Sequence, residues 1–209
     1  MTRLLLDTQI DAYVTAGLHT LADVEEPAFR ALFEPLRNLA ADLPQDAFPE
    51  DGVVPYVAVV TDQLISPETR VPLLRLSDSP KEGIVDRIHG DEGLAPYAPR
   101  AELQVPQAPV YLLKGVDRGD EFRDVAPLDA AATISSRGRT PLTIDEGLSL
   151  AAAHPAVLFK NHCFMLAGST RGDKRVPALW ISAKAPKLGW CFDKVPHSWL
   201  GIASASSRT

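Results

Sequence analysis

A short motif occurs twice in the chain, and this repeat limits the folds that the sequence can adopt more than any other feature. Arg-Val-Pro-Leu-Leu-Arg-Leu-Ser at residues 70–77 returns as Arg-Val-Pro-Ala-Leu-Trp-Ile-Ser at residues 175–182, with five of the eight positions identical. Each copy is followed by Pro-Lys-x-Gly, starting at Pro80 and at Pro186. Each is preceded by an apolar strand-like run and, before that, by a helical segment. We therefore predict an internal duplication.

The repeat leads to a predicted fold class. We expect an α+β fold in which a helix–hairpin–strand unit occurs at about residues 7–116 and again at 140–208. The two halves would pair into one pseudo-symmetric domain, residues 1–209, with a mainly antiparallel sheet. Pro72 and Pro177 stand second in the two copies and cannot donate a ladder hydrogen bond, so each should lie at the start of a strand or on a sheet edge.

Local signals predict the first helices. Residues 7–43 have helical apolar spacing, with Asp7 as the expected cap and Gly17 as a weak point or an end. Pro27 suits the first turn of a second helix, which Pro35 should kink or split.

Other elements are expected further along the chain. Residues 53–61 form a run that is apolar on both faces and predict a buried strand, and 70–77 and 110–116 predict further strands. A short helix is expected around residues 128–134. Thr143 and Glu146 form a capping box that should begin a helix ending before Pro155. Residues 117–121 predict a charged turn.

Charge and composition exclude several classes of protein. The chain has 21 basic and 27 acidic residues, a net charge of −6, which argues against nucleic-acid binding. No apolar run approaches the roughly 20 residues that a membrane helix needs, so no membrane contact is expected. Two cysteines in 209 residues do not make a disulfide framework, and we expect reduced thiols and a cytoplasmic location.

The two thiols are the first candidate site. Cys163 and Cys191 lie on expected strands and are interpreted first as small buried hydrophobic residues. Alternatively, either thiol is a catalytic nucleophile, Cys191 with His197 and Asp193 as the most complete set. A zinc site lacks support, because no C-x2-4-C or H-x3-5-H spacing is present. We predict no metal and no cofactor.

The long irregular segment at residues 84–109 carries the second candidate site. Its sequence His89-Gly90-Asp91-Glu92-Gly93 places a histidine beside two carboxylates, which suits a general base, a metal ligand or a polar clamp on a ligand. The same residue types are common in exposed turns. A functional site and an ordinary exposed turn both remain possible interpretations of this segment.

Aromatic residues near the C-terminus form the third candidate. Trp180, Trp190 and Trp199 are expected on neighbouring strands, where tryptophan normally fills a core. The alternative is an aromatic ligand pocket with Arg175, Lys187 and His197 at its rim.

Several blocks of the sequence resemble a known family. They include RGRTPLTIDEGLSLAAAHP, CFMLAGSTRGDKRVPALWIS, PKLGWC and HSWLGIASA, with LLRLSDSPKEGIVD and HGDEGLAPYAPR in the first half. These blocks closely resemble a family of bacterial domains of unknown function, typical of high-GC bacteria, and they span nearly the whole chain. The resemblance implies a single cytoplasmic unit and transfers no activity.

Three functions follow as hypotheses. The first is a non-catalytic binding protein that holds a small molecule or a protein partner in a cleft between the two halves, covered by the His89 segment. The second is a small enzyme, acting through Cys191 or Cys163 with His197, or by acid–base chemistry through His89 with Asp91 or Glu92. The third is an obligate subunit whose partner supplies the chemistry. The sequence does not predict an oligomeric state.

Overall fold

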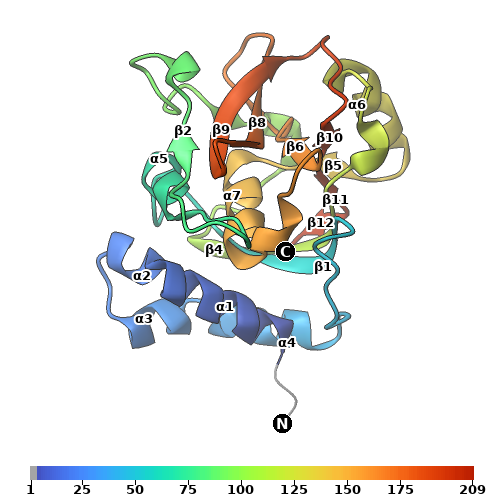
Figure 1. Cartoon of the computed structure of the whole chain (residues 1–209). Helices are drawn as coiled ribbons and strands as arrows, with labels where there is room; N and C mark the ends of the chain where they lie inside the picture. The colour runs from blue at the N-terminus through green and yellow to red at the C-terminus, as the bar shows by residue number, and fades with distance from the viewer. Residues whose placement is uncertain (1–3) are drawn as a thin grey trace.

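Two five-stranded sheets and a layer of helices make up the fold, which a computed structural model describes for residues 4–209 (Figure 1). The first sheet has the order β1-β4-β11-β5, with β12 also paired to β4. Its strands are β1 (Val53–Val60), β4 (Val110–Asp117), β5 (Thr140–Pro141), β11 (Ser204–Ala205) and β12 (Ser207–Arg208). All its pairings are antiparallel.

The second sheet has the order β10-β6-β8-β9-β2. Its strands are β2 (Ile84–Val85), β6 (Cys163–Met165), β8 (Arg175–Ser182), β9 (Ala185–Phe192) and β10 (Leu200–Ile202). The β6–β8 and β8–β9 pairs are antiparallel, and the outer pairs β10–β6 and β2–β9 are parallel. A separate antiparallel pair, β3 (Ala98–Pro99) with β7 (Ser169–Thr170), joins the long segment to the connection between β6 and β8. The predicted α+β class with mostly antiparallel sheets is confirmed.

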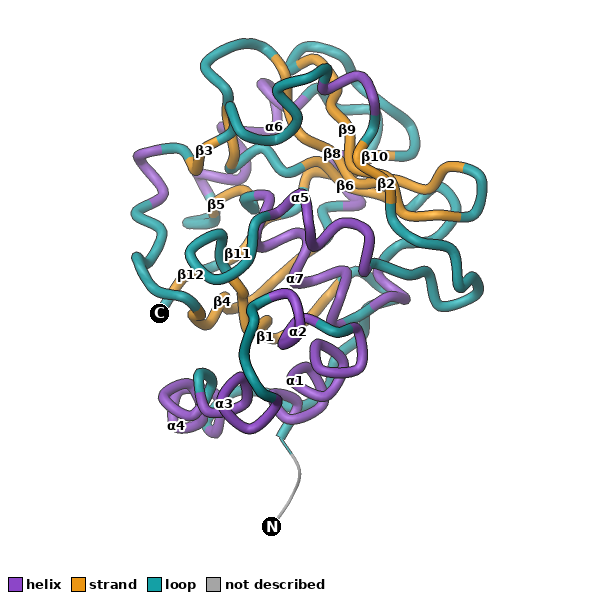
Figure 2. The backbone as a smooth tube through the Cα atoms, turned by 90° about the vertical axis from the view of Figure 1, so that its left-hand side faces the viewer, coloured by secondary structure: helices purple, strands orange, loops and turns teal. Residues whose placement is uncertain are grey.

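Helices cover the first sheet and fill the space between the sheets. The bounds are α1 (Leu5–Ala16), α2 (Leu18–Leu21), α3 (Glu26–Ala31), α4 (Arg37–Ala41), α5 (Pro67–Arg70), α6 (Pro127–Ser136) and α7 (Ile144–Ala153). The short 3-10 turns are η1 (Glu34–Leu36), η2 (Val71–Leu73), η3 (Arg87–His89), η4 (Ala101–Leu103), η5 (Asp120–Phe122) and η6 (Pro155–Val157). Helices α1–α4 lie beneath β1 and β4, and α7 lies between the two sheets (Figures 1 and 2). Within residues 4–209, no helix combines the length and apolar character needed to cross a membrane.

Strand β1 separates the two hydrophobic clusters. Tyr56, Ala58 and Val60 pack with the N-terminal helices, whereas Val57 and Val59 pack with the cluster between the sheets. This alternation follows from the two-residue period of a strand. The predicted burial of both faces is therefore confirmed.

The predicted helix breaks are found in the N-terminal region. Gly17, with φ of 90°, ends α1, and Pro27 lies in the first turn of α3. Pro35 lies in η1, between α3 and α4. The prediction for Asp7 is wrong: α1 begins at Leu5, and the Asp7 carboxylate accepts a hydrogen bond from the Leu4 amide, 3.2 Å away.

Helix α7 begins as the capping box predicts. The Glu146 amide donates to the Thr143 hydroxyl over 3.3 Å, and the Thr143 amide donates to Glu146 Oε2 over 2.7 Å. Glu146 is fully buried, and its carboxylate also accepts hydrogen bonds from Tyr111 and Arg208.

The structure does not confirm the internal duplication. Residues 175–182 form strand β8, but residues 70–77 begin at the end of α5 and continue through η2, so the predicted strand at 70–77 is wrong. Long-range partners decide the difference. The buried Arg70 guanidinium donates to the Val60 carbonyl and pairs with Asp145 at the start of α7, whereas β8 pairs with β9 along its whole length.

The two repeat prolines also differ in role. Pro72 lies at the start of η2, where a missing amide hydrogen costs nothing. Pro177 lies inside the second sheet rather than at its edge, so that expectation is wrong. It is tolerated because the β6–β8 register pairs are at Ala178 and Leu179, and beyond them Pro177 uses only its carbonyl, which accepts from the Leu166 amide over 2.7 Å.

Candidate functional site

The two cysteines are free thiols on the second sheet, and burial governs their chemistry. Cys163 in β6 is 3% exposed and donates to the Phe159 carbonyl over 3.7 Å. Burial raises the pKa of both Cys163 and Cys191 to about 11. Reactive cysteines have lowered pKa values, so both thiols have the environment of buried hydrophobic residues.

The proposed thiol partners do not assemble around Cys191. The His197 ring packs against Trp199, with centroids 5.4 Å apart, and no hydrogen bond joins it to Cys191 in the described chain. Asp193, the third member of the set, lines a hollow that Cys191 does not line; this hollow, the central cleft, is described below.

The predicted His89 site is dispersed. His89 is 4% exposed, packs edge-on against Tyr97 at 5.7 Å, and has its pKa lowered by burial. Glu92 instead pairs with Arg171 at 2.9 Å, and Asp91 is exposed. Among residues 4–209, no hydrogen bond links His89 to either carboxylate. The arrangement therefore lacks the contact that an acid–base pair needs.

The three tryptophans lie on two different faces of the β8–β9 hairpin. Trp190 pairs with Pro177 in register, so it lies on the face opposite to Trp180. Trp190 donates its indole hydrogen to the Ile88 carbonyl over 3.1 Å. Trp180 and Trp199 are in contact, with ring centroids 6.0 Å apart at 78°. The three tryptophans therefore do not form one cluster: Trp180 and Trp199 are in contact, and Trp190 lies apart on the other face.

Arg175 lies on the face of Trp190, and Lys187, although in register with Trp180, forms an ion pair elsewhere. The Arg175 guanidinium lies 4.9 Å from the Trp190 ring centroid. Lys187 pairs with Asp86 at 3.3 Å and so ties β9 to the start of the long segment. Neither lines the hollow beside Trp180 and Trp199.

That hollow, here called the aromatic pocket, has a volume of about 390 Å³. Its lining residues are Lys160, Asn161, Cys163, Trp180, Ile181, Ser182 and Trp199. Trp180 fits against the sheet only because residue 189 is glycine, since a Cβ there would lie 2.1 Å from the indole.

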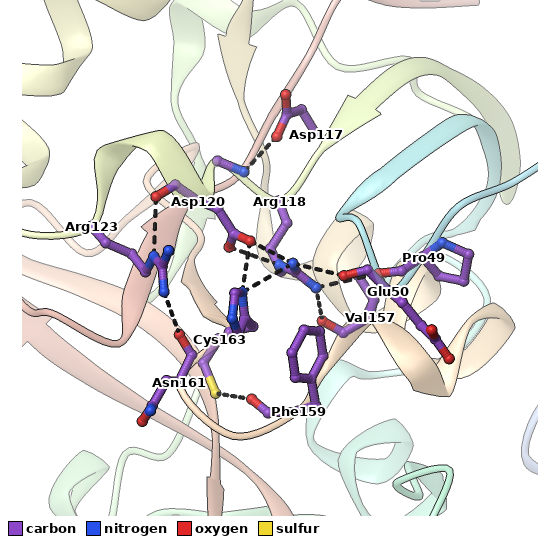
Figure 3. A network of polar contacts seen from close by, with 12 residues as sticks. Pro49, Glu50, Asp117, Arg118, Asp120, Arg123, Val157, Phe159, Asn161 and Cys163 are labelled. Atoms are coloured by element: carbon purple, nitrogen blue, oxygen red, sulfur yellow. Dashed lines mark hydrogen bonds and ion pairs between the residues drawn. The ribbon is translucent and has the colours of Figure 1, made fainter.

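A buried arginine ties the loops behind this pocket together (Figure 3). Arg118 is 1% exposed and donates to the Asp120 carboxylate at 2.8 and 2.5 Å. It also donates to three backbone carbonyls, those of Pro49, Glu50 and Val157. The sequence indicated only a charged turn here, and no local signal reveals that Arg118 is buried.

Asp120 connects Arg118 to His162, because its carboxylate is hydrogen-bonded to both side chains. Burial raises the pKa of Asp120, but hydrogen bonds from Arg118 and His162 outweigh it and hold the pKa below its usual value. His162 Nδ1 lies 2.7 Å from Asp120 Oδ2; because an ionised carboxylate can only accept, Nδ1 carries the proton. Among the described residues, no hydroxyl or thiol is hydrogen-bonded to His162. The pair therefore orients a loop rather than activating a nucleophile.

The structure has a second hollow, here called the central cleft. The sequence predicts a cleft but does not identify this set of lining residues. The central cleft has a volume of about 470 Å³ and lies between η4, α6, β5 and the second sheet. Its lining residues are Arg100, Glu102, Leu103, Pro127, Leu128, Ala131, Ile134, Ser135, Arg139, Thr140, Pro141, Ala167, Val176, Asp193 and Ile202. The walls are mainly apolar, and four charged side chains line them. This composition is typical of small-molecule sites.

Asp193 is the unusual member of the cleft. Its Oδ1 atom is buried and has no hydrogen-bond partner in residues 4–209. Backbone hydrogen bonds fix the residue, since its amide donates to the Lys174 carbonyl and its carbonyl accepts from the Leu128 amide. A buried carboxylate oxygen without a donor is costly and uncommon in native proteins.

The arginines of the cleft are anchored as well. Arg139 donates to the backbone carbonyls of Gly115 and Ser204, at 2.7 and 2.9 Å. Arg100 donates from Nε to the Ala167 carbonyl over 2.8 Å. The cleft thus presents charges held in place by the backbone. The part of the chain that the structure describes contains no group of three or more His, Cys, Asp or Glu side chains suited to a metal ion.

Comparison with known proteins agrees with the resemblance of the sequence blocks. The profile described as a family of unknown function, DUF5701, matches residues 12–209. The chain belongs to this family. Neither the curated proteins nor the solved structures include a match to this DUF5701 chain. The site must therefore be interpreted from its own geometry.

Proposed function

We propose that this DUF5701 chain is a non-catalytic binding protein that holds a small, largely apolar molecule in the central cleft. The observation that carries the proposal is an apolar hollow of about 470 Å³ lined by Asp193, whose carboxylate has one buried oxygen without a hydrogen-bond partner in residues 4–209. A ligand with an N–H or O–H group would find an acceptor in the Asp193 carboxylate. Apolar lining with a few fixed polar groups is the usual composition of such sites.

The charges of the cleft limit the ligand. Arg100 and Arg139 oppose Glu102 and Asp193, so the lining has no net charge. This balance favours a neutral or zwitterionic ligand over a strongly charged one, because an excess ligand charge would lose its hydration without a counter-charge.

Leu128 marks the mouth of the cleft. It lies on α6 and is 52% exposed, whereas Ile134, six residues later on the same helix, is 1% exposed. A large exposed apolar side chain beside a cleft gains from contact with an apolar ligand. The long segment covers the cleft through Arg100, Glu102 and Leu103 of the η4 region rather than through His89.

Native mass spectrometry of the full chain, purified from its own host under mild conditions, tests the proposal. We expect the chain to carry a small non-covalent molecule. Asp193→Asn should reduce its occupancy, because an amide accepts a weaker hydrogen bond than a carboxylate. Leu128→Gln should do the same by making the mouth polar.

Leu39→Gln provides the matched control. Leu39 lies on α4, is 39% exposed and does not line the cleft. Its variant should keep the molecule at the wild-type level. A chain that carries no small molecule, or one that all three variants retain equally, would contradict the proposal.

A cytoplasmic location is part of the same proposal. Both cysteines are free, which fits the reducing conditions of the cytoplasm. The net charge of −6 disfavours a nucleic-acid partner.

A further inference from the structure

We infer that the aromatic pocket is a second ligand site, separate from the central cleft, and that it takes a small planar aromatic anion such as an arene carboxylate. The two hollows share no lining residue. The inference therefore does not depend on the proposed function of the cleft.

The walls of the pocket suit a flat ring. Trp180 and Trp199 are both partly exposed, and their rings meet at 78° with centroids 6.0 Å apart. They offer a guest the face of one indole and the edge of the other, which is the arrangement that aromatic rings prefer. Ile181 adds an apolar contact.

Trp180 is held in place from below. The indole lies over Gly189 on the neighbouring strand β9, and any larger residue would displace it. Because the ring is fixed before a ligand arrives, little conformational entropy would be lost on binding.

The positive charge of Lys160 determines that the expected ligand is an anion. Lys160 is the single charged residue among those that line the pocket, and it is exposed and forms no ion pair within residues 4–209. The other lining residues are neutral, Cys163 included, because burial raises its pKa to about 11. An anionic group at the rim would meet Lys160, and a cation would meet no counter-charge.

The turn that carries Lys160 is rigidly supported (Figure 3). Phe159 and His162 bridge its two ends, and their rings stack at 4.2 Å. Asn161 adopts a φ of 66°, which asparagine tolerates in turns. His162 is bonded to Asp120, and the Arg118 guanidinium lies 4.9 Å from the Phe159 ring centroid.

Arg118 also helps to hold the Lys160 turn in position for ligand binding. Because Arg118 is almost fully buried and donates to backbone carbonyls of two other segments, the Pro49–Glu50 turn and Val157 at the end of η6, the turn behind it cannot shift independently. Lys160 and Asn161 are therefore presented at a fixed place on the rim. Sites that are supported in this way bind with less reorganisation.

A pair of matched probes tests the inference: 2-naphthoate and its neutral analogue 2-naphthamide. Binding is followed by tryptophan emission in the Trp190→Phe variant, which leaves Trp180 and Trp199 as the reporters. We expect naphthoate to change this emission in a saturable way and to bind more tightly than naphthamide. Lys160→Gln should weaken naphthoate binding about two- to fivefold, as for a partly exposed charge pair, and leave naphthamide unchanged.

Two controls locate the site. Lys174→Gln removes an exposed lysine outside the pocket and should leave the naphthoate affinity unchanged. Leu128→Gln alters only the central cleft and should also leave it unchanged. Trp199→Leu should abolish binding if the variant retains the wild-type circular dichroism spectrum.

Specific results would overturn the inference. It fails if naphthoate does not bind at millimolar concentration, if naphthamide binds equally well, or if Lys160→Gln and Lys174→Gln weaken binding to the same extent. Because Lys160 lies on an exposed turn, its variant should fold, and this arm decides the question even if Trp199→Leu does not fold. Loss of binding in Leu128→Gln would assign the probe to the cleft instead.

Discussion

Arg208 forms a bidentate ion pair with Glu146, with Nε to Oε1 at 2.6 Å and Nη2 to Oε2 at 2.9 Å. Glu146 is fully buried and Arg208 is 5% exposed. The pair joins β12 to the first turn of α7. The same carboxylate accepts from the Tyr111 hydroxyl at 2.6 Å and from the Thr143 amide, so a single side chain connects the capping box, β4 and β12.

Removing the charge of Arg208 should therefore destabilise the fold strongly. Arg208→Met leaves the Glu146 carboxylate buried without its counter-charge, and we expect a loss of about 3–5 kcal/mol in the free energy of unfolding. Urea unfolding followed by circular dichroism measures this loss. The double variant Glu146→Gln with Arg208→Met should recover part of it, because no unpaired charge is left. Equal losses in the single and double variants would contradict this account.

His154 should make the stability depend on pH in the acidic range. It ends α7, is 8% exposed, and its Nε2 lies 3.1 Å from Gln9 Nε2. The Gln9 amide nitrogen can only donate, so His154 Nε2 accepts and the ring is neutral. Burial lowers the pKa of His154 from 6.5 to about 4.

The direction of the pH effect follows from linkage. Between pH 6.5 and 4 the unfolded chain binds a proton at this residue and the folded chain does not, so stability falls as the pH falls through that range. The slope from His154 should reach about 1.4 kcal/mol per pH unit. Urea unfolding at pH 7, 5.5 and 4.5 should show a shallower slope for His154→Gln than for the wild type. His89 and His197, whose pKa values burial also lowers, would leave a residual slope.

Local signals in the sequence predict part of this fold. The capping box of Thr143 and Glu146 and the break at Gly17 act within one or two helical turns, so the sequence contains all that decides them. Strand β1 was also predictable, because burial on both faces needs an apolar residue at nearly every position.

Contacts between distant segments decide the rest. Residues 70–77 resemble residues 175–182, yet they begin with helical turns at 70–73 and form no strand, because Arg70 pairs with Asp145 and β8 pairs with β9. The buried Arg118 depends on three carbonyls from two other segments, the turn at Pro49 and Glu50 and the end of η6 at Val157. The candidate sites are distributed in the same way: Asp193 and Arg100 of the central cleft are far apart in the chain, and no motif links them.

The two cysteines should react slowly in the folded protein. With a pKa of about 11, each thiol is far less ionised at pH 7.5 than an unperturbed thiol of pKa about 8.5. The thiolate is the reactive form, so labelling by 5,5′-dithiobis(2-nitrobenzoate) should be about 100-fold slower in buffer than in urea. Cys163→Ser and Cys191→Ser report the two positions separately.

The labelling result also separates the binding protein from the thiol enzyme. A catalytic Cys191 needs a nearby base, and His197 instead packs on Trp199. Fast labelling of Cys191 in the native protein would show that the thiol is activated and would favour the enzyme. Cys163 offers an internal comparison, because it lines the aromatic pocket and Cys191 does not. If 2-naphthoate occupies that pocket, it should slow the labelling of Cys163 further and leave that of Cys191 unchanged.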